Sequence, residues 1–387
     1  MKQVSIIHWR SSAVRSRWPR RPRGFTLVEM MVGLLLGLIT TLIVAQVLVN
    51  SEGQRRNASS GVDAQVNGAL ALYTLQRDVQ MAGYGFSPFP SALGCTVKGK
   101  FGATAITDFT LAPVLITTGA NGGPDTLKIL ASAKTSFAVP MYVTEDHPAT
   151  TVDYFVVSSA LGAAVGDLML AAPGTYDATH WCSLFMVTSS GATPQETLGA
   201  NYIPHEFGSG ASWNHSGTDV FPAAGYPAGS YVMNLGTMVN RTYAVGTQGL
   251  QAATLTSSGA TTTTTDVSGQ VVSLKALYGK DTDADGRVDT FDATTPASAA
   301  EWQQVLAVRL AIVARSGQYE KEVVTANNPV WDVGSTGTSG LTGATTCNST
   351  SKCITIKLGD NTDTTWQHYR YKVYDTVIPL RNMIWNL

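Results

Sequence analysis

The stretch "RPRGFTLVEMMVGLLLGLITTLIVAQVLVN", from Arg21 to Asn50, decides how the rest of the chain is arranged. Between Phe25 and Val49 its one charged residue is Glu29. About 20 successive apolar residues suffice to cross the hydrocarbon core of a bilayer. The sequence therefore predicts a membrane-spanning helix over residues 25–49, with a carboxylate close to its start that needs an explanation.

Residues 1–24 predict the orientation of this span. They contain seven basic side chains and no acidic one, and an excess of Lys and Arg keeps a flank in the cytoplasm. A secretory signal is the alternative reading. Its apolar core is shorter, however, and it ends in a small-residue cleavage site that the sequence after Val49 lacks. We expect a single-pass protein whose larger part lies outside the cytoplasm.

The composition of the remaining chain limits its partners. Of the 26 Lys and Arg residues, seven lie in the leader, which leaves 19 basic against 27 acidic residues. Such a surface is a poor match for nucleic acid. With 387 residues and 44% hydrophobic content, the chain is long enough to bury a large core beyond its membrane segment.

Four cysteines lie after the span, on the side where disulfides persist. Three pairings are possible. We expect Cys347 to pair with Cys353, because the short loop "CNSTSKC" makes their encounter frequent, and Cys95 to pair with Cys182. A zinc site or free buried thiols are the alternative, although the spacings fit no usual zinc pattern.

The helical pattern continues beyond the span, over residues 50–85. Val62, Val66, Leu70 and Tyr73 recur at three- and four-residue spacing, and Leu72, Leu75 and Val79 lie on the adjoining strip. Such an amphipathic helix needs a sheet to cover its apolar side. The run of glycines and prolines in "AGYGFSPFP" should end the helix.

From residue 86 to 387 the pattern changes to short β-prone runs between turn residues. Leu306, Val308, Leu310 and Ile312, for example, alternate along one strand face. Two segments poor in apolar residues, Ser257–Gly269 and Val333–Ser351, are expected to be exposed loops. The predicted fold class is α+β, a long N-terminal helix packed on a large, mainly antiparallel β domain.

The motif "RGFTLVE" resembles the processing and methylation site of type IV prepilins and related pseudopilins. The resemblance implies that residues 1–24 are a leader, removed by a membrane prepilin peptidase between Gly24 and Phe25, and that the new amino group is methylated. A carboxylate within a membrane helix is costly and points to a function. Glu29 would then pair with the amino group of Phe25 on a neighbouring subunit and fix the axial register of assembly.

Three further stretches look like those of PilW-type minor pilins: Leu75–Phe86, Val271–Asp289 and Tyr369–Trp385. Residues 100–265 resemble nothing recognisable. The resemblance implies a subunit of the inner membrane with its β domain in the periplasm, and later at the pilus tip or cell surface. Its partners would be other minor pilins, the major pilin, the prepilin peptidase and the inner-membrane assembly platform. A type II secretion pseudopilin and a tip adhesin remain alternatives.

The segment "DTDADGRVDTFD", Asp281–Asp292, fits a twelve-residue calcium loop. The expected ligands are Asp281, Asp283, Asp285, the carbonyl of Arg287, Asp289 and Asp292. The last departs from the template, in which a longer Glu binds in bidentate fashion. We expect Ca²⁺ to fasten this loop structurally; a solvated acidic turn is the alternative.

The sequence contains no pattern that predicts an enzyme. The six histidines are scattered, and neither an H-E-x-x-H nor a G-x-S-x-G motif is present. We expect a structural protein without catalytic residues.

Overall fold

The computed structural model describes residues 24–102, 104–106, 109–135, 139–208, 213–215, 217–256, 262–334, 344–347, 351–359 and 363–384. The chain divides into two compact units, Met1–Asn57 and Ala58–Leu387. The predicted leader, apart from Gly24, lies outside the described residues.

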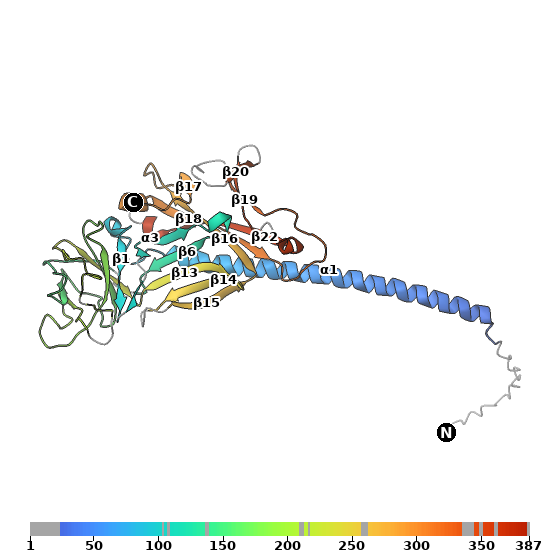
Figure 1. The fold of residues 1–387 in the computed structure, drawn as a ribbon, viewed down its shortest axis with the longest axis horizontal. Coiled ribbons are helices and arrows are strands. Elements are labelled where there is room, and N and C mark those ends of the chain that lie inside the picture. The colour runs from blue at the N-terminus through green and yellow to red at the C-terminus, as the bar shows by residue number, and fades with distance from the viewer. Residues whose placement is uncertain are drawn as a thin grey trace, which may run out of the picture. The chain divides into compact units, whose positions relative to one another are not determined.

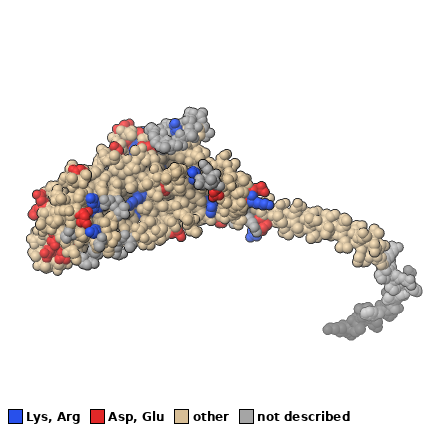
Figure 2. Space-filling view, viewed as in Figure 1, with Lys and Arg blue, Asp and Glu red and all other residues tan. Residues whose placement is uncertain are grey.

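The first helix, α1, runs from Leu27 to Met81 (Figure 1). Its segment Leu27–Arg55 has a mean hydropathy of 2.5 and is long and apolar enough to cross a membrane. In Figure 2 this segment is free of charged side chains over most of its length. The predicted apolar helix is thus present, and it continues without a break into the amphipathic stretch.

A large and mostly antiparallel β domain follows α1, as the sequence predicted. Its strands are β1 (Thr96–Lys98), β2 (Lys100–Phe101), β3 (Thr104–Ala105), β4 (Phe109–Thr110), β5 (Val114–Thr117), β6 (Thr126–Ala131), β7 (Met141–Tyr142), β8 (Tyr154–Val156), β9 (Leu168–Ala172), β10 (Cys182–Met186), β11 (Tyr202–Pro204), β12 (Tyr231–Gly236), β13 (Val239–Gly246), β14 (Gly249–Leu255), β15 (Thr262–Gly269), β16 (Val271–Lys280), β17 (Thr290–Asp292), β18 (Val305–Arg315), β19 (Val330–Gly334), β20 (Ala344–Cys347), β21 (Ser351–Thr355) and β22 (Tyr371–Pro379). Short helices complete it: η1 (Pro90–Ala92), η2 (Ala120–Gly122), α2 (Ala299–Gln303), η3 (Thr365–His368) and α3 (Arg381–Ile384).

The strands form three larger sheets, ordered β4-β1-β10-β9-β12-β7, β15-β14-β13-β6-β5 and β17-β16-β18-β22, besides the small sheet β19-β21-β20 and the pairs β11-β8 and β2-β3. One pair, β1 with β10, is parallel. Strand β18 lies inside its sheet and is buried on both faces: Leu310 and Ile312 join the main core, whereas Ala311 and Val313 join a second core under the small sheet.

The part of α1 beyond Ala58 packs on the β domain through the small residues Gly68 and Ala71 and the larger Leu75 and Val79. Ala71, Leu75 and Val79 belong to the main core. A Cβ added to Gly68 would lie 2.4 Å from the Tyr374 ring of β22, so this glycine permits a close approach. The expected burial of Leu75 and Val79 is confirmed.

The neighbouring strip of α1 does not face the sheet, contrary to the prediction. Val62, Val66, Leu70 and Tyr73 are exposed to 55, 59, 49 and 65%. The reason is steric, because the helix approaches the sheet most closely where its side chains are smallest, and this turns the larger apolar residues outward. Periodicity identified an apolar side of the helix but not which strip of it the sheet would cover.

The threonine-rich segment is also not the exposed loop that was predicted. Thr262–Gly269 forms β15, an edge strand paired with β14 from Leu250–Ser268 through Leu255–Thr262. Threonine is β-branched and favours extended backbone. Composition predicted the exposure of this segment correctly, but the partner strand supplied the hydrogen bonds that make it a strand.

Candidate functional site

The start of α1 holds the predicted processing site. Phe25 is 88% exposed, and Thr26 precedes the first helical residue. The carboxylate of Glu29 accepts hydrogen bonds from the backbone N–H and the hydroxyl of Thr26, each at 3.0 Å. The N–H of Glu29 in turn lies 3.2 Å from Oγ1 of Thr26.

These reciprocal contacts between Thr26 and Glu29 form a capping box. They satisfy two backbone donors at the helix start, and the negative carboxylate is favourable beside the positive end of the helix dipole. Sequence analysis missed this role, although the spacing T-x-x-E at Thr26–Glu29 is its signature. Glu29 therefore has a structural partner within its own chain.

The strip of α1 that faces outward was predicted from the sequence to pack against the sheet, but its side chains are exposed. Five apolar residues, Val62, Val66, Leu70, Tyr73 and Met81, lie on this strip at i, i+4, i+8, i+11 and i+19, and the exposed side chain of Arg77 interrupts it at i+15. We call these five residues the α1 stripe. Exposed apolar patches on a folded domain are typical of interaction surfaces.

A polar clamp holds α1 to the five-stranded sheet. Asp78 accepts hydrogen bonds from the guanidinium of Arg241 and from the hydroxyl of Tyr243, the latter at 2.7 Å. Burial, and then the carboxylate of Asp78, raise the pKa of Tyr243 to about 12, so its hydroxyl stays a donor. Two residues of β13, separated from each other by Thr242 alone, thus bind one carboxylate, which fixes the rotation of the helix.

The acidic loop between β16 and β17 brings three of its predicted ligands together. One carboxylate oxygen from each of Asp281, Asp283 and Asp285 lies within 4.8 Å of the other two. Asp281 is buried, and its carboxylate accepts from the N–H groups of Ala284 and Gly286 at 2.7 and 2.8 Å. Gly286 has φ +84°, the sharp turn that the template requires.

The remaining predicted ligands of this loop have other partners. Asp289 accepts from the N–H and hydroxyl of Thr282, which lowers its pKa. Asp292 lies 2.9 Å from the ammonium of Lys280 across the strand pair β16–β17. Desolvation, together with the charges of Asp289, Asp285 and Asp281, raises the pKa of Asp283, because like charges close together disfavour its ionised form.

Both predicted disulfides are present, Cys95–Cys182 and Cys347–Cys353. The alternative of zinc or free thiols is therefore wrong, since each of the four sulfurs is bonded to another cysteine. The short bridge links β20 to β21, next to each other in the small sheet.

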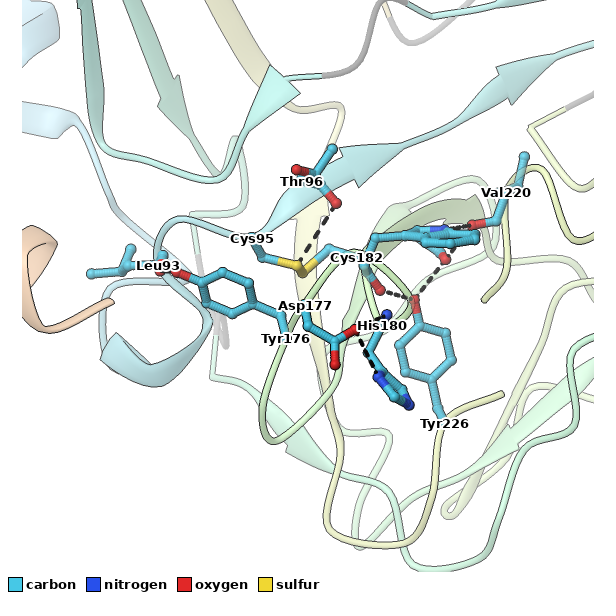
Figure 3. The surroundings of a disulfide bond; sticks show 11 residues. Leu93, Cys95, Thr96, Tyr176, Asp177, His180, Cys182, Val220 and Tyr226 are labelled. Carbon is cyan, nitrogen blue, oxygen red and sulfur yellow. Dashed lines mark hydrogen bonds and ion pairs between the residues drawn. A yellow bond between two sulfur atoms is a disulfide. The ribbon is translucent and has the colours of Figure 1, made fainter. Parts of the chain in front are cut away.

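The long bridge lies beside the parallel pair β1–β10, where Val97 is the register partner of Cys182 (Figure 3). Both cysteines are fully buried. Nearby, the hydroxyl of Tyr176 donates to the carbonyl of Leu93 at 2.8 Å, and that of Tyr226 lies 2.6 Å from Oγ of Ser183. The bridge thus joins the residue directly before β1 to the first residue of β10, the neighbouring strand in the six-stranded sheet.

Comparisons with known proteins match both ends of the chain. Residues 238–382 match the family model of Type IV Pilus-assembly protein W. Residues 19–45 match the prokaryotic N-terminal methylation motif. No curated protein and no solved structure matches the chain.

The two matches cover some of the features described above; the α1 stripe and the Cys95–Cys182 bridge lie outside them. The N-terminal match includes Gly24, Phe25 and Glu29, and the C-terminal match runs from β13 into α3 and includes the acidic loop and, of the clamp, Arg241 and Tyr243 but not Asp78. They support a type IV pilus minor pilin, a structural protein that its apolar helix anchors in a membrane. The resemblance inferred from the sequence is confirmed, because this chain matches a PilW-type prepilin.

Proposed function

We propose that this protein is a minor pilin that starts assembly of a type IV pilus as part of a priming complex and then remains at or near the tip. Its leader would be removed by the prepilin peptidase between Gly24 and Phe25. The partners are other minor pilins, the major pilin and the inner-membrane assembly platform, and the β domain lies in the periplasm before assembly.

The α1 stripe is the observation that carries this proposal. Its residues follow the candidate membrane segment Leu27–Arg55 in the chain, so lipid is not their expected cover. They are also turned away from the core of their own domain. An apolar strip at helical spacing is suited to a partner helix that packs ridges into grooves. The helix of another pilin-like subunit is the partner we propose.

Glu29 has a second proposed role in the processed subunit. Cleavage after Gly24 would create a positive amino group on Phe25, four residues from Glu29. In a bundle of apolar helices, a neighbour's amino group is a suitable partner for this carboxylate, since isolated charges are costly there. Such a pair would set the axial register of the subunits. The capping box holds the carboxylate near the helix start in the meantime.

The decisive test is a deletion of the gene. Surface pili are counted by electron microscopy, and secretion of extracellular enzymes is assayed in the same strain. We expect pili to be lost and secretion to be unchanged, with recovery of pili on complementation. Intact pili with lost secretion would instead assign the protein to a type II secretion system as a pseudopilin.

Processing is tested separately by intact-mass analysis of the protein extracted from membranes. The expected chain begins at N-methylated Phe25. A chain that still begins at Met1 in cells with an active prepilin peptidase would contradict the proposed cleavage.

For the loop between β16 and β17 we propose that it binds Ca²⁺ as a structural ion. Asp281, Asp283 and Asp285 would supply carboxylates, with the Arg287 carbonyl and Asp289 as further ligands. The proposal is supported by the convergence of three oxygen donors and by the glycine turn at Gly286. Asp292 would have to leave Lys280 to take part, so a site without it is our preferred form.

A further inference from the structure

A cavity of about 350 Å³ lies on the face of β16 that is turned away from α1. Its floor and walls comprise Asp125, Lys275, Leu277, Ala293, Trp331 and Ile354, and the turn Thr118–Gly122 forms its mouth. Ligand sites usually have volumes of about 300–1,000 Å³, with mostly apolar walls and a few convergent polar groups. This cavity has both properties.

The side chain of Asp125 builds the polar part of the cavity. Its carboxylate accepts from the N–H of Gly119 in the mouth at 2.9 Å and from the N–H of Ala276 in β16 at 3.0 Å. It also lies 2.7 Å from the ammonium of Lys275. One buried carboxylate thus joins the turn, the strand and the lysine, so the cavity is formed before any ligand arrives.

In the floor of the cavity, hydrogen-bond donors remain unpaired within the described structure, whereas the acceptors are nearly all in use. An ammonium has three N–H donors, and among the described residues Lys275 has Asp125 as its one hydrogen-bond partner. The indole N–H of Trp331 is buried and has no acceptor in the described part of the chain. Asp125 already accepts three of the roughly four hydrogen bonds that a carboxylate can take. The floor therefore has spare donors and almost no spare acceptor.

The charge of the floor limits the ligand further. Lys275 and Asp125 form a neutral pair, and both are more than nine-tenths buried. A charged ligand would bring a third, uncompensated charge into this partly dry site, which is costly. An uncharged acceptor would use the spare donors without that cost. The side chains of Leu277, Ala293 and Ile354 provide apolar contact for the rest of the molecule.

We propose that this cavity binds a small uncharged molecule with an apolar body and a carbonyl oxygen, which accepts hydrogen bonds from Lys275 and Trp331. The site is distinct from the assembly surface. Leu277 and Trp331 belong to the core under the small sheet, whereas Ala276 faces the main core that α1 covers. Binding here leaves the α1 stripe accessible, and the proposal does not depend on the function proposed above.

The test uses the full chain in lipid nanodiscs and ¹⁹F NMR of three probes of similar shape. 4-Fluorophenylacetamide has an uncharged carbonyl, 4-fluorophenylacetate carries a negative charge, and 4-fluorotoluene has no acceptor. Empty nanodiscs give the contribution of lipid. We expect saturable binding of the amide, at least about threefold tighter than that of either other probe, as one net hydrogen bond predicts.

Two variants locate the binding. Ala293→Leu fills the cavity without touching the ion pair and should weaken amide binding at least about tenfold, while Trp331→Phe removes one donor, keeps most of the ring and should weaken it about three- to tenfold. Ala253→Leu is the matched control, since Ala253 is a half-buried alanine in the lining of a different cavity, and it should bind as the unchanged chain does. Far-UV circular dichroism confirms that each variant is folded.

Three outcomes would overturn the proposal. Binding of the amide that does not exceed the empty nanodiscs would remove the site. Unchanged binding in folded Ala293→Leu would place it elsewhere. Equal or tighter binding of the acetate would refute the class of ligand, because it would mean that the floor prefers negative charge.

Discussion

The imidazole rings of His147 and His205 meet with their Nε2 atoms 2.9 Å apart, in a part of the β domain where both residues are almost completely buried. Phe155 stacks on His147 with ring centroids 3.9 Å apart, and Phe221 stacks on His205 at 5.2 Å. The Nδ1 atom of each ring has no hydrogen-bond partner among the described residues. One neutral ring must donate to the other, so the pair is compatible with no net charge.

This pair predicts loss of stability in acid. Burial lowers the pKa of His147 from about 6.5 to about 4, and burial together with the charge of His147 lowers that of His205 well below its ordinary value. A depressed pKa in the folded state means that the stabilisation is complete above about pH 6.5 and is lost as the pH falls toward 4. The shift of His147 corresponds to about 3 kcal/mol.

The measurement is the melting temperature of the full chain between pH 7.5 and pH 4. We expect a steep fall below pH 6.5 and a shallower one in His147→Gln/His205→Gln, even though that variant is less stable at neutral pH. His180→Gln, at a more exposed histidine, should keep the steep fall. Identical slopes for the double variant and the unchanged chain would show that carboxylates, not this pair, govern the acid response.

Removal of the long disulfide should cost more stability than removal of the short one. Cys95 and Cys182 are 87 residues apart in sequence, whereas Cys347 and Cys353 are six apart. On the chain-entropy model the two bridges stabilise by about 4–5 and about 2 kcal/mol respectively. Denaturant unfolding of Cys95→Ala/Cys182→Ala and Cys347→Ala/Cys353→Ala checks the order, and a larger loss for the second variant would contradict it.

The clamp on α1 predicts a measurable effect from a single hydroxyl. Tyr243→Phe leaves Asp78 with Arg241 but removes one hydrogen bond to a buried carboxylate. Hydrogen bonds to charged groups contribute about 1.5–3 kcal/mol, so the free energy of unfolding should fall by about that amount. Tyr142→Phe, at an exposed tyrosine, serves as the control and should change it by less than about 0.5 kcal/mol. Equal effects of the two would mean that the clamp adds nothing.

Calcium should raise the melting temperature of the chain if the acidic loop binds it, because an ion that binds only the folded state stabilises that state. Asp283→Ala/Asp285→Ala should abolish this rise. Glu145→Ala/Glu322→Ala removes two exposed carboxylates elsewhere and should preserve it. A chain that melts at the same temperature with millimolar calcium and with chelator would refute the metal site.

The α1 stripe predicts an assembly defect without a folding defect. Leu70→Glu places a charge in the middle of the stripe, at a residue that is 49% exposed, so the free energy of unfolding should change by less than about 0.5 kcal/mol. Pilus number should fall strongly, since a buried unpaired charge at a helix interface costs several kcal/mol. Gln65→Glu, on a polar part of the same helix, should assemble normally. Normal piliation with Leu70→Glu would refute the stripe as an interface.

Local sequence determined much of this protein. The uninterrupted apolar run after an arginine-rich leader predicted the N-terminal helix, because crossing a membrane requires length and apolarity and little else. Alternation at Leu306–Ile312 predicted β18, and the spacing of the acidic loop predicted the turn at Gly286. The disulfides were also predicted correctly, although the long one rested on elimination from four cysteines rather than on any local signal.

Tertiary structure decided which apolar residues are covered and which strands exist. The strip of α1 that faces the sheet is set by Gly68, Ala71 and their contacts with β22 and the core, which no periodicity reveals. Thr262–Gly269 became a strand because β14 lies beside it. Asp78 with Tyr243, Lys275 with Trp331, and His147 with His205 each join residues at least 56 positions apart. Such pairs arise only when distant strands pair, and sequence spacing carries no information about them.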